Sequence, residues 1–474
     1  MRRLLPLFAM IVALTDCGES ARDEAVSLSV IRDKGSVIES ATAQGLVAFD
    51  SDGQIEPALA ERWIVSDDGL SLVFRLGRKT WSNGKSVQAD DVAQSLKQSF
   101  AKAGDGRLGH LFSAFDSVVA MTDRVIEIRL KQPRPNMLQL LAQPEFGIRH
   151  NGFGTGPYRV YNNMNSATVL RPSKTVDDMD VALTEEQMAA QEVHLRGESA
   201  AMGISRYLQG QTQAVLGGTF EDYPLVQAQR LRPSQIVIDP VRGLFGLAFV
   251  GRNPITSDVI IRQALNMAID REALARTLNL PNWSMRETIL PARLDSGAEP
   301  AVPDWSGSAI DARRAEAARR ISNWSSHHKD RAVVKVALPT GAGARLLFAR
   351  IAADWRSIGV QAISVGMRDA ADLRLIDEVA PSASVNWYFT RLSCDAGLPC
   401  DQISDQALLA ERAADTLDAR SGDYAQADSA YAANATFIPL GNPFRWSLTS
   451  VRLPGLRPSV YGVHPLAYLR AARN

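Results

Sequence analysis

Short runs of alternating hydrophobic and polar residues recur along the chain, and this period of two predicts β-strands. The runs lie at 26–30, 70–76 and 126–130, and a further strand is predicted at 244–250. Asp52-Gly53 and Asp68-Gly69 lie between extended runs and predict tight turns. The segment from Pro57 to Trp63 is interpreted as a short helical turn.

Other segments carry apolar residues on one helical face, and helices are predicted at about 90–100, 258–269, 310–321 and 344–358. Asp258 is placed to cap the second of these helices, and Asp270 to begin another. A strand at 333–338, a helix ended by Gly359 and a strand from Val360 form a βαβ unit. Since such a unit joins parallel strands, the fold class is predicted as α/β.

The length and charge of the chain narrow the class of protein. With 474 residues, the chain is expected to form two or three domains. Its 52 Lys and Arg residues balance 52 Asp and Glu residues, so the formal net charge is zero. A binder of nucleic acid or of another large polyanion would carry a basic excess, so neither class is favoured.

The N-terminus has the pattern of an export signal. Arg2 and Arg3 precede an apolar stretch at 4–14, which is too short to span a bilayer as a helix but fits a secretory signal. Residues 1–17 are therefore predicted to be a signal peptide of lipoprotein type, with Cys17 carrying the lipid. Asp16 departs from the usual lipoprotein pattern, and a plain signal peptide cut after Cys17 is the alternative.

Cys394 and Cys400 bracket a short loop, and in an oxidising compartment two cysteines this close in sequence predict a disulfide. A metal site is the alternative, and it would need Asp395 or Asp401 because no histidine lies nearby. The adjacent His327 and His328 do not share a face of a helix or strand, so they give little support to a nickel site.

Four segments carry a family resemblance in a fixed order along the chain. They are Gly53-Gln-Ile-Glu-Pro-Ala-Leu-Ala-Glu-Arg-Trp63 with the Asp68-Gly69 strand after it, the turn Gly154-Thr-Gly-Pro-Tyr158, the helical pair with Arg262-Gln-Ala-Leu265 and Ala268-Ile-Asp-Arg271, and the helix from Ala344 to Val360. Together they resemble family 5 of the extracytoplasmic solute-binding proteins, the peptide- and nickel-binding family of ABC importers. The glycine-rich turn is interpreted as a structural loop, since it lacks the Gly-Lys-Ser/Thr ending of a phosphate loop.

The resemblance implies a periplasmic-binding-protein-like fold of cluster C type, with two lobes of mixed sheets around a ligand cleft. Lobe I is expected at 18–265 and 440–474, with an extra subdomain at about 46–150. Lobe II is expected at 266–439. The segment from Tyr461 to Tyr468 is expected to return to lobe I.

The resemblance also implies a function. The chain is expected to capture a peptide or similar small solute and deliver it to an ABC permease and ATPase complex at the inner membrane. It is expected to work in the periplasm as a monomer, without a cofactor and without catalysis; no Gly-x-Ser-x-Gly or His-Glu-x-x-His motif is present. The alternative is a ligand-sensing or transporter-orphaned binding protein that signals to a membrane partner.

Candidate ligand residues lie where this chain departs from the family pattern. Peptide-binding members commonly carry a W-x-x-D-Y-x-D-P run, and the region here contains Trp387, Tyr388 and Arg391 without the paired acids. These three are the first candidates, and Arg391 in place of an acid favours an anionic group on the ligand. Phe245 is a fourth candidate, with core packing as the alternative.

Overall fold

The computed structural model describes residues 25–469 apart from short gaps at 51, 105–113, 165–166, 174–182, 252, 295–296, 298, 329–330, 395–397, 399–401 and 414–416. The predicted signal peptide with Cys17 lies outside the described residues. No helix in the described part of the chain is long and apolar enough to cross a membrane.

The first of two large sheets has seven strands in the order β10-β11-β12-β1-β13-β20-β14. At its centre β1 pairs in parallel with both β12 and β13, and the flanking strands are antiparallel. The strands are β1 (Val26–Ile31), β10 (Tyr158–Met164), β11 (Ala167–Pro172), β12 (Val193–Glu198), β13 (Ala214–Thr219), β14 (Ile236–Asp239) and β20 (Arg445–Thr449). We call the part of the protein built on this sheet lobe I.

The second sheet has five strands in the order β17-β16-β18-β15-β19, and it forms lobe II. The predicted βαβ unit is confirmed, because β16 and β17 pair in parallel and α11 connects them. The sheet is mixed, since β15 pairs antiparallel with β18 and β19. The strands are β15 (Gly243–Phe249), β16 (Val333–Leu338), β17 (Gln361–Gly366), β18 (Leu373–Val379) and β19 (Phe437–Gly441).

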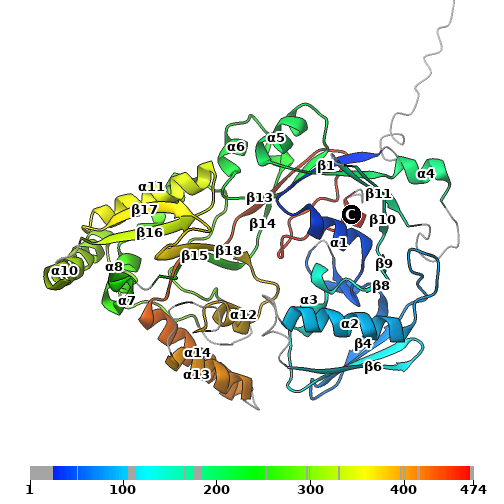
Figure 1. Ribbon diagram of the computed structural model, residues 1–474, viewed down its shortest axis with the longest axis horizontal. Helices are drawn as coiled ribbons and strands as arrows, with labels where there is room; N and C mark the ends of the chain where they lie inside the picture. Colours follow the sequence, from blue (N-terminus) through cyan, green and yellow to red (C-terminus); the bar gives the residue numbers. More distant parts are fainter. Residues whose placement is uncertain are drawn as a thin grey trace, which may run out of the picture.

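The chain crosses between the two lobes twice (Figure 1). The first crossing, residues 240–242, joins β14 to β15, and the second, residues 442–444, joins β19 to β20. The first crossing therefore lies ahead of the boundary at 265 expected from the sequence. The physical reason is that β15 forms its hydrogen bonds with β18 and β19 rather than with any strand of lobe I.

A third, four-stranded antiparallel sheet forms a subdomain of lobe I, in the order β4-β5-β7-β6. Its strands are β4 (Ala60–Val65), β5 (Ser71–Leu76), β6 (Phe115–Thr122) and β7 (Val125–Leu130), and α2 (Ala89–Gly104) packs against it. The helical turn predicted from Pro57 to Trp63 is wrong. Trp63 pairs with Phe74 across the sheet, so pairing with β5 overrides the local helix-forming composition.

Two small hairpin-like pairs complete the sheets. β2 (Val47–Phe49) pairs with β3 (Ile55–Pro57), and β8 (Arg149–His150) pairs with β9 (Phe153–Gly154). The end of β9 and the turn after it pack tightly on the end of α1, since a Cβ at Gly154 would lie 2.0 Å from the Thr42 carbonyl oxygen and one at Gly156 would lie 2.4 Å from the Ala41 carbonyl oxygen. This turn therefore needs glycine for packing, as the structural interpretation of it expected.

The remaining elements are helices and short 3-10 turns (Figure 1). The predicted caps are present: Asp258 accepts a hydrogen bond from the Ile260 amide at 2.8 Å, and Asp270 from the Ala273 amide at 2.8 Å. These helices are α1 (Lys34–Thr42), α3 (Met137–Leu141), α4 (Glu185–Ala190), α5 (Ala200–Leu208), α6 (Tyr223–Gln227), α7 (Pro254–Ser257), α8 (Val259–Met267), α9 (Arg271–Leu278), α10 (Ile310–His328), α11 (Ala342–Arg356), α12 (Val385–Thr390), α13 (Gln402–Ala413) and α14 (Leu417–Asn434), with 3-10 turns η2 (Pro144–Phe146), η3 (Pro233–Gln235) and η5 (Leu466–Tyr468).

Contacts between the lobes are polar as well as apolar. The Gly343 amide at the start of α11 donates to the Glu221 carbonyl oxygen of lobe I at 2.9 Å. Arg445 of β20 forms an ion pair with Asp377 of β18 at 2.8 Å.

The C-terminal segment packs on lobe I, where His464 lies 3.1 Å from the Asp239 carboxylate.

Candidate ligand-binding site

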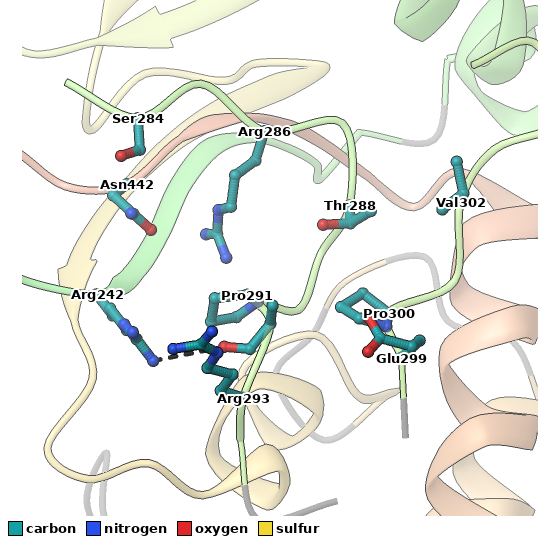
Figure 2. Close-up of a pocket in the computed structure, with 11 residues that line it drawn as sticks. Arg242, Ser284, Arg286, Thr288, Pro291, Arg293, Glu299, Pro300, Val302 and Asn442 are labelled. Carbon is teal, nitrogen blue, oxygen red and sulfur yellow. Dashed lines mark hydrogen bonds between the residues drawn. The ribbon is translucent and has the colours of Figure 1, made fainter. Parts of the chain in front are cut away.

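A pocket of about 500 Å³ lies at the two crossings between the lobes (Figure 2). This volume is within the range that encloses a small organic molecule. Arg242 is the last residue of the first crossing and Asn442 the first residue of the second, while the other lining residues belong to the long connection between α9 and α10. The lining residues are Arg242, Ser284, Arg286, Thr288, Pro291, Ala292, Arg293, Glu299, Pro300, Val302 and Asn442.

The connection between α9 and α10 is held in place although it contains little regular structure. Its start runs beside the second crossing, where the Asn442 amide donates to the Ser284 carbonyl oxygen at 2.9 Å. The Trp283 indole donates to the Asn442 carbonyl oxygen at 2.7 Å. Glu287 accepts a hydrogen bond from Arg313 of α10 at 2.9 Å. The pocket wall is therefore tied to both the crossing and lobe II.

A buried arginine also holds this connection in place. Arg271, the first residue of α9, donates to the Arg286 and Pro439 carbonyl oxygens, each at 2.9 Å. Its side chain also donates to the Asn266 side-chain oxygen at 2.7 Å. Burial lowers the pKa of Arg271 to about 10, so the guanidinium stays protonated at neutral pH. Arg271, the last residue of the Ala268-Ile-Asp-Arg271 motif, thus has a structural role.

Arg286 points its guanidinium into the pocket (Figure 2). One terminal nitrogen donates to the Ile289 carbonyl oxygen at 3.2 Å, and the other contacts the carbonyl oxygens of Gly441, at 3.3 Å, and Gly243. Its Nε is buried without a hydrogen-bond partner among the described residues. Burial lowers the pKa of Arg286 to about 10, and the nearby charge of Arg242 acts in the same direction. The group is a cation at neutral pH whose charge no carboxylate in the described chain neutralises.

Arg242 and Arg293 line the same space and are exposed to solvent. Within the described residues neither side chain forms an ion pair, and Arg242 donates one long hydrogen bond, at 3.4 Å, to the Ala292 carbonyl oxygen. Glu299 is the single carboxylate among the lining residues. The pocket therefore carries more positive than negative charge.

The predicted residues Trp387 and Tyr388 lie on α12 and are fully buried, with 1% and 0% exposure. Their rings form an edge-to-face pair with centroids 4.9 Å apart. The charges of Arg286 and Arg242 act on the Tyr388 hydroxyl, which shows that this group lies near the pocket. Burial has a larger effect than these charges and raises the pKa of Tyr388 to about 12. Trp387 carries a buried indole nitrogen without a hydrogen-bond partner in the described chain.

Arg391 lies at the end of α12 and is not free to receive an anion. Its Nε donates to a Glu378 carboxylate oxygen at 2.9 Å, and a second hydrogen bond joins the same two side chains. This hydrogen bonding with Glu378 raises the pKa of Arg391. An anionic ligand group at Arg391 would have to displace Glu378.

Phe245 lies in the core rather than at the pocket. Its ring is 1% exposed and packs edge-on against Phe220 at 4.9 Å and Trp283 at 5.7 Å. Phe220 belongs to lobe I, so Phe245 helps to join the two lobes. Core packing, the alternative given for Phe245 from the sequence, is what the structure supports, because no surface of the ring is left for a ligand.

The sequence also offered a disulfide between Cys394 and Cys400, with a metal site as the alternative. The structure records Cys394 as disulfide-bonded, while Cys400 lies outside the described residues, so the pairing of these two cysteines stays a prediction. No group of three or more His, Cys, Asp or Glu side chains in the described part of the chain could hold a metal ion.

Sequence reasoning missed the arginines of the pocket. Arg286 and Arg293 lie in a proline-containing connection without hydrophobic periodicity, and Arg242 lies between two strands that belong to different sheets. Nothing in the local pattern brings these three positions together. The pairing of β15 with β19 brings the two crossings together, and the hydrogen bond between Asn442 and Ser284 places the connection beside them.

Comparison with known proteins gives a family and a fold. Residues 54–393 match the model of the bacterial extracellular solute-binding proteins, family 5. The chain is 25% identical over 273 residues to the probable deoxycholate-binding periplasmic protein YgiS of Escherichia coli strain K12, covering 49% of this chain and 48% of that protein. It is 23% identical over 480 residues to the probable di/tripeptide-binding protein 5 of Pseudomonas aeruginosa strain UCBPP-PA14, covering 88% of this chain and 87% of that protein.

Several curated relatives are matched over only about half of their length, between 48% and 56%. The structural match is more complete. The crystal structure of Haemophilus influenzae OppA in complex with RPPGFSPFR superposes with a TM-score of 0.75, covering 94% of this chain and 97% of that chain at 14% identity. At this identity the likeness establishes the two-lobed fold and leaves the ligand open.

Proposed function

Because the chain belongs to the bacterial extracellular solute-binding proteins of family 5, we propose that it captures a peptide or similar small solute between its lobes and delivers it to an ABC importer. The partner is a membrane permease and ATPase complex, and the chain itself acts as a monomeric binding component without a cofactor. Binding rather than catalysis is the role of the relatives whose names state an activity.

The observation that carries this proposal is the pocket at the two crossings. Arg242 and Asn442 line it, and each belongs to one of the two crossings between the large sheets in the described chain. A ligand held there contacts the segments about which the lobes would move. Ligand contacts that differ between an open and a closed form are what shift a two-state equilibrium.

The Gly343–Glu221 and Arg445–Asp377 contacts join lobe II to lobe I beside the crossings. Moving a population from 1:99 to 99:1 closed requires a ligand preference of about 5.5 kcal/mol. A few charge-assisted hydrogen bonds made only in the closed form would supply it.

We propose the periplasm as the compartment, with export directed by residues 1–17 and a lipid on Cys17 as the anchor. This part of the proposal rests on Arg2, Arg3 and the apolar stretch after them. A disulfide at Cys394 fits an oxidising compartment.

The test combines binding with uptake. The exported protein is purified and screened by thermal shift against di- and tripeptides, bile acids, opines, nickel chelates and small anions. A ligand at 100 times its dissociation constant adds about 2.7 kcal/mol to the free energy of unfolding, which is readily measured. A strain that lacks the protein should then fail to take up the solute that stabilises it.

Uptake that continues in the deletion strain, together with loss of a cellular response to the solute, would contradict the importer role and favour the ligand-sensing alternative. Absence of any stabilising solute for a cooperatively unfolding protein would contradict ligand capture itself.

A further inference from the structure

Three arginines without a carboxylate partner in the described part of the chain line one pocket, whereas two half-buried arginines near the crossings are paired. Arg391 is paired with Glu378, and Arg445 with Asp377. Arg242, Arg286 and Arg293 have no such partner among the described residues. Figure 2 shows their side chains reaching toward the same space.

The positive charge of these arginines is not fully balanced within the described part of the chain. Arg286 is half-buried and has lost much of its hydration, while Arg242 lies near enough to repel it. Like charges that face one another in a partly dehydrated space disfavour the protonated form of both. An anion in the pocket would relieve this repulsion and replace the missing hydration.

The pocket also contains polar groups that are not used within the described chain. The Arg286 Nε is a donor that is buried without a partner, and the Asn442 side-chain oxygen is an acceptor that is buried without a partner. The Ser284 and Thr288 hydroxyls line the same wall. Guanidinium groups match the geometry of a two-oxygen anion, because their paired N–H donors can bind both oxygens at once.

We propose that this pocket binds the carboxylate or phosphate group of the captured solute, with Arg242, Arg286 and Arg293 as its partners. The inference rests on the proposed function as a solute-binding protein and names the chemical class of the solute. At about 500 Å³ the pocket is larger than an inorganic ion, so the anionic group belongs to a larger molecule whose remainder extends away from the arginines.

Glu299 shapes the selectivity of the same pocket. Its carboxylate lines the same space as the arginines but carries the opposite charge, so it would repel a second anionic group on the solute. A solute with one acidic group and an otherwise neutral or cationic body is therefore favoured over a polyanion.

The experiment measures binding by isothermal titration calorimetry at constant ionic strength. The carboxylate probes are succinate and the dipeptide Ala-Ala, the phosphate probe is glycerol 3-phosphate, and the neutral controls are succinamide and glycerol. Inorganic phosphate tests whether the anion alone suffices. The variants are Arg286→Met and the double variant Arg242→Met/Arg293→Met, and the matched control is Arg276→Met, an exposed arginine on α9 outside the pocket.

We expect at least one acidic probe to bind the wild type more tightly than its neutral counterpart. Loss of one charge-assisted contact should weaken this binding by at least about tenfold in either pocket variant. The Arg276→Met control should bind like the wild type, and Glu299→Gln should bind a dianion more tightly. Because Arg286 also holds three backbone carbonyls, the double variant provides the decisive comparison if Arg286→Met fails to fold.

Two results would overturn the inference and leave the proposed function standing. One is equal binding of acidic probes by the wild type and the double variant, and the other is binding of neutral solutes with none of the acidic ones. Failure of the folded wild type to bind any solute, acidic or neutral, would overturn the proposed function together with the inference.

Discussion

Asp428 on α14 carries a buried carboxylate whose replacement by asparagine should stabilise the protein at neutral pH. One carboxylate oxygen accepts a hydrogen bond from the Ala301 amide at 2.6 Å, in the connection that lines the pocket. The other oxygen is buried without a partner among the described residues. Burial raises the pKa of Asp428 from its ordinary 3.8 to about 6.

The direction of the pH dependence follows from this raised pKa. Between pH 4 and 6 the folded state binds a proton that the unfolded state has already released, so folding is favoured as the pH falls. Above pH 6 the folded state holds a charged carboxylate in a poorly hydrated site. The difference between 3.8 and about 6 corresponds to a destabilisation of about 3 kcal/mol at most, at 1.36 kcal/mol per pKa unit.

Asp428→Asn keeps an oxygen for the Ala301 amide and removes the charge. We expect the variant to be about 1–3 kcal/mol more stable than the wild type at pH 8 and equally stable at pH 4. Urea unfolding at pH 4, 5, 6, 7 and 8 measures both proteins, and the difference between them cancels the titration of all other groups. A difference that does not change with pH, or a variant less stable at pH 8, would refute the reasoning.

Other consequences of the structure can be tested separately. Gly343→Ala should lower the free energy of unfolding in urea by about 1–3 kcal/mol, because its Cβ would lie 2.0 Å from the Phe220 carbonyl oxygen. Gly422→Ala lies on an exposed face of α14 with open space around it and should raise the free energy of unfolding by about 0.5–1 kcal/mol. Equal effects of the two substitutions would contradict the packing of α11 on lobe I. Arg271→Lys should lower the free energy of unfolding by about 2–4 kcal/mol although the charge is kept, because a lysine cannot donate to the Arg286, Pro439 and Asn266 oxygens together. An unchanged free energy of unfolding would show that these contacts are dispensable. Non-reducing peptide mapping of the exported protein should recover Cys394 linked to Cys400, and a free thiol at Cys394 would contradict the disulfide.

Local sequence signals predicted those elements whose patterns depend on near neighbours. Asp258 and Asp270 both cap helices as expected, because a side chain that accepts from an amide two or three residues later needs no distant partner. Gly359 has a positive φ of +88° just after α11, as predicted for a glycine that ends this helix.

Long-range pairing decided the features that the sequence did not predict. The stretch ending at Trp63 has a helix-forming composition, but β5 offers it a complete ladder of backbone partners. The crossing at 240–242 carries no local mark, because the strands on its two sides look alike and differ only in the sheet that they join.

The candidate site shows the same division. The burial of Trp387 and Tyr388 follows from their aromatic character, yet the place of Tyr388 near Arg286 depends on how lobe II folds. The arginines of the pocket come from segments more than 40 residues apart, and they meet because Asn442 and Ser284 join the second crossing to the connection before α10. No single window of sequence contains that information.

Ligand-dependent closure of the two lobes tests the central claim most directly. Met121 of β6 and Leu409 of α13 are exposed, at 54% and 59%, and lie on lobe I and lobe II. Fluorescent dyes on Met121→Cys and Leu409→Cys report the distance between the lobes by energy transfer while a stabilising solute is titrated. The account predicts that the distance changes with the same half-saturation as binding, whereas a solute that binds fully without any change in energy transfer would contradict capture between the lobes.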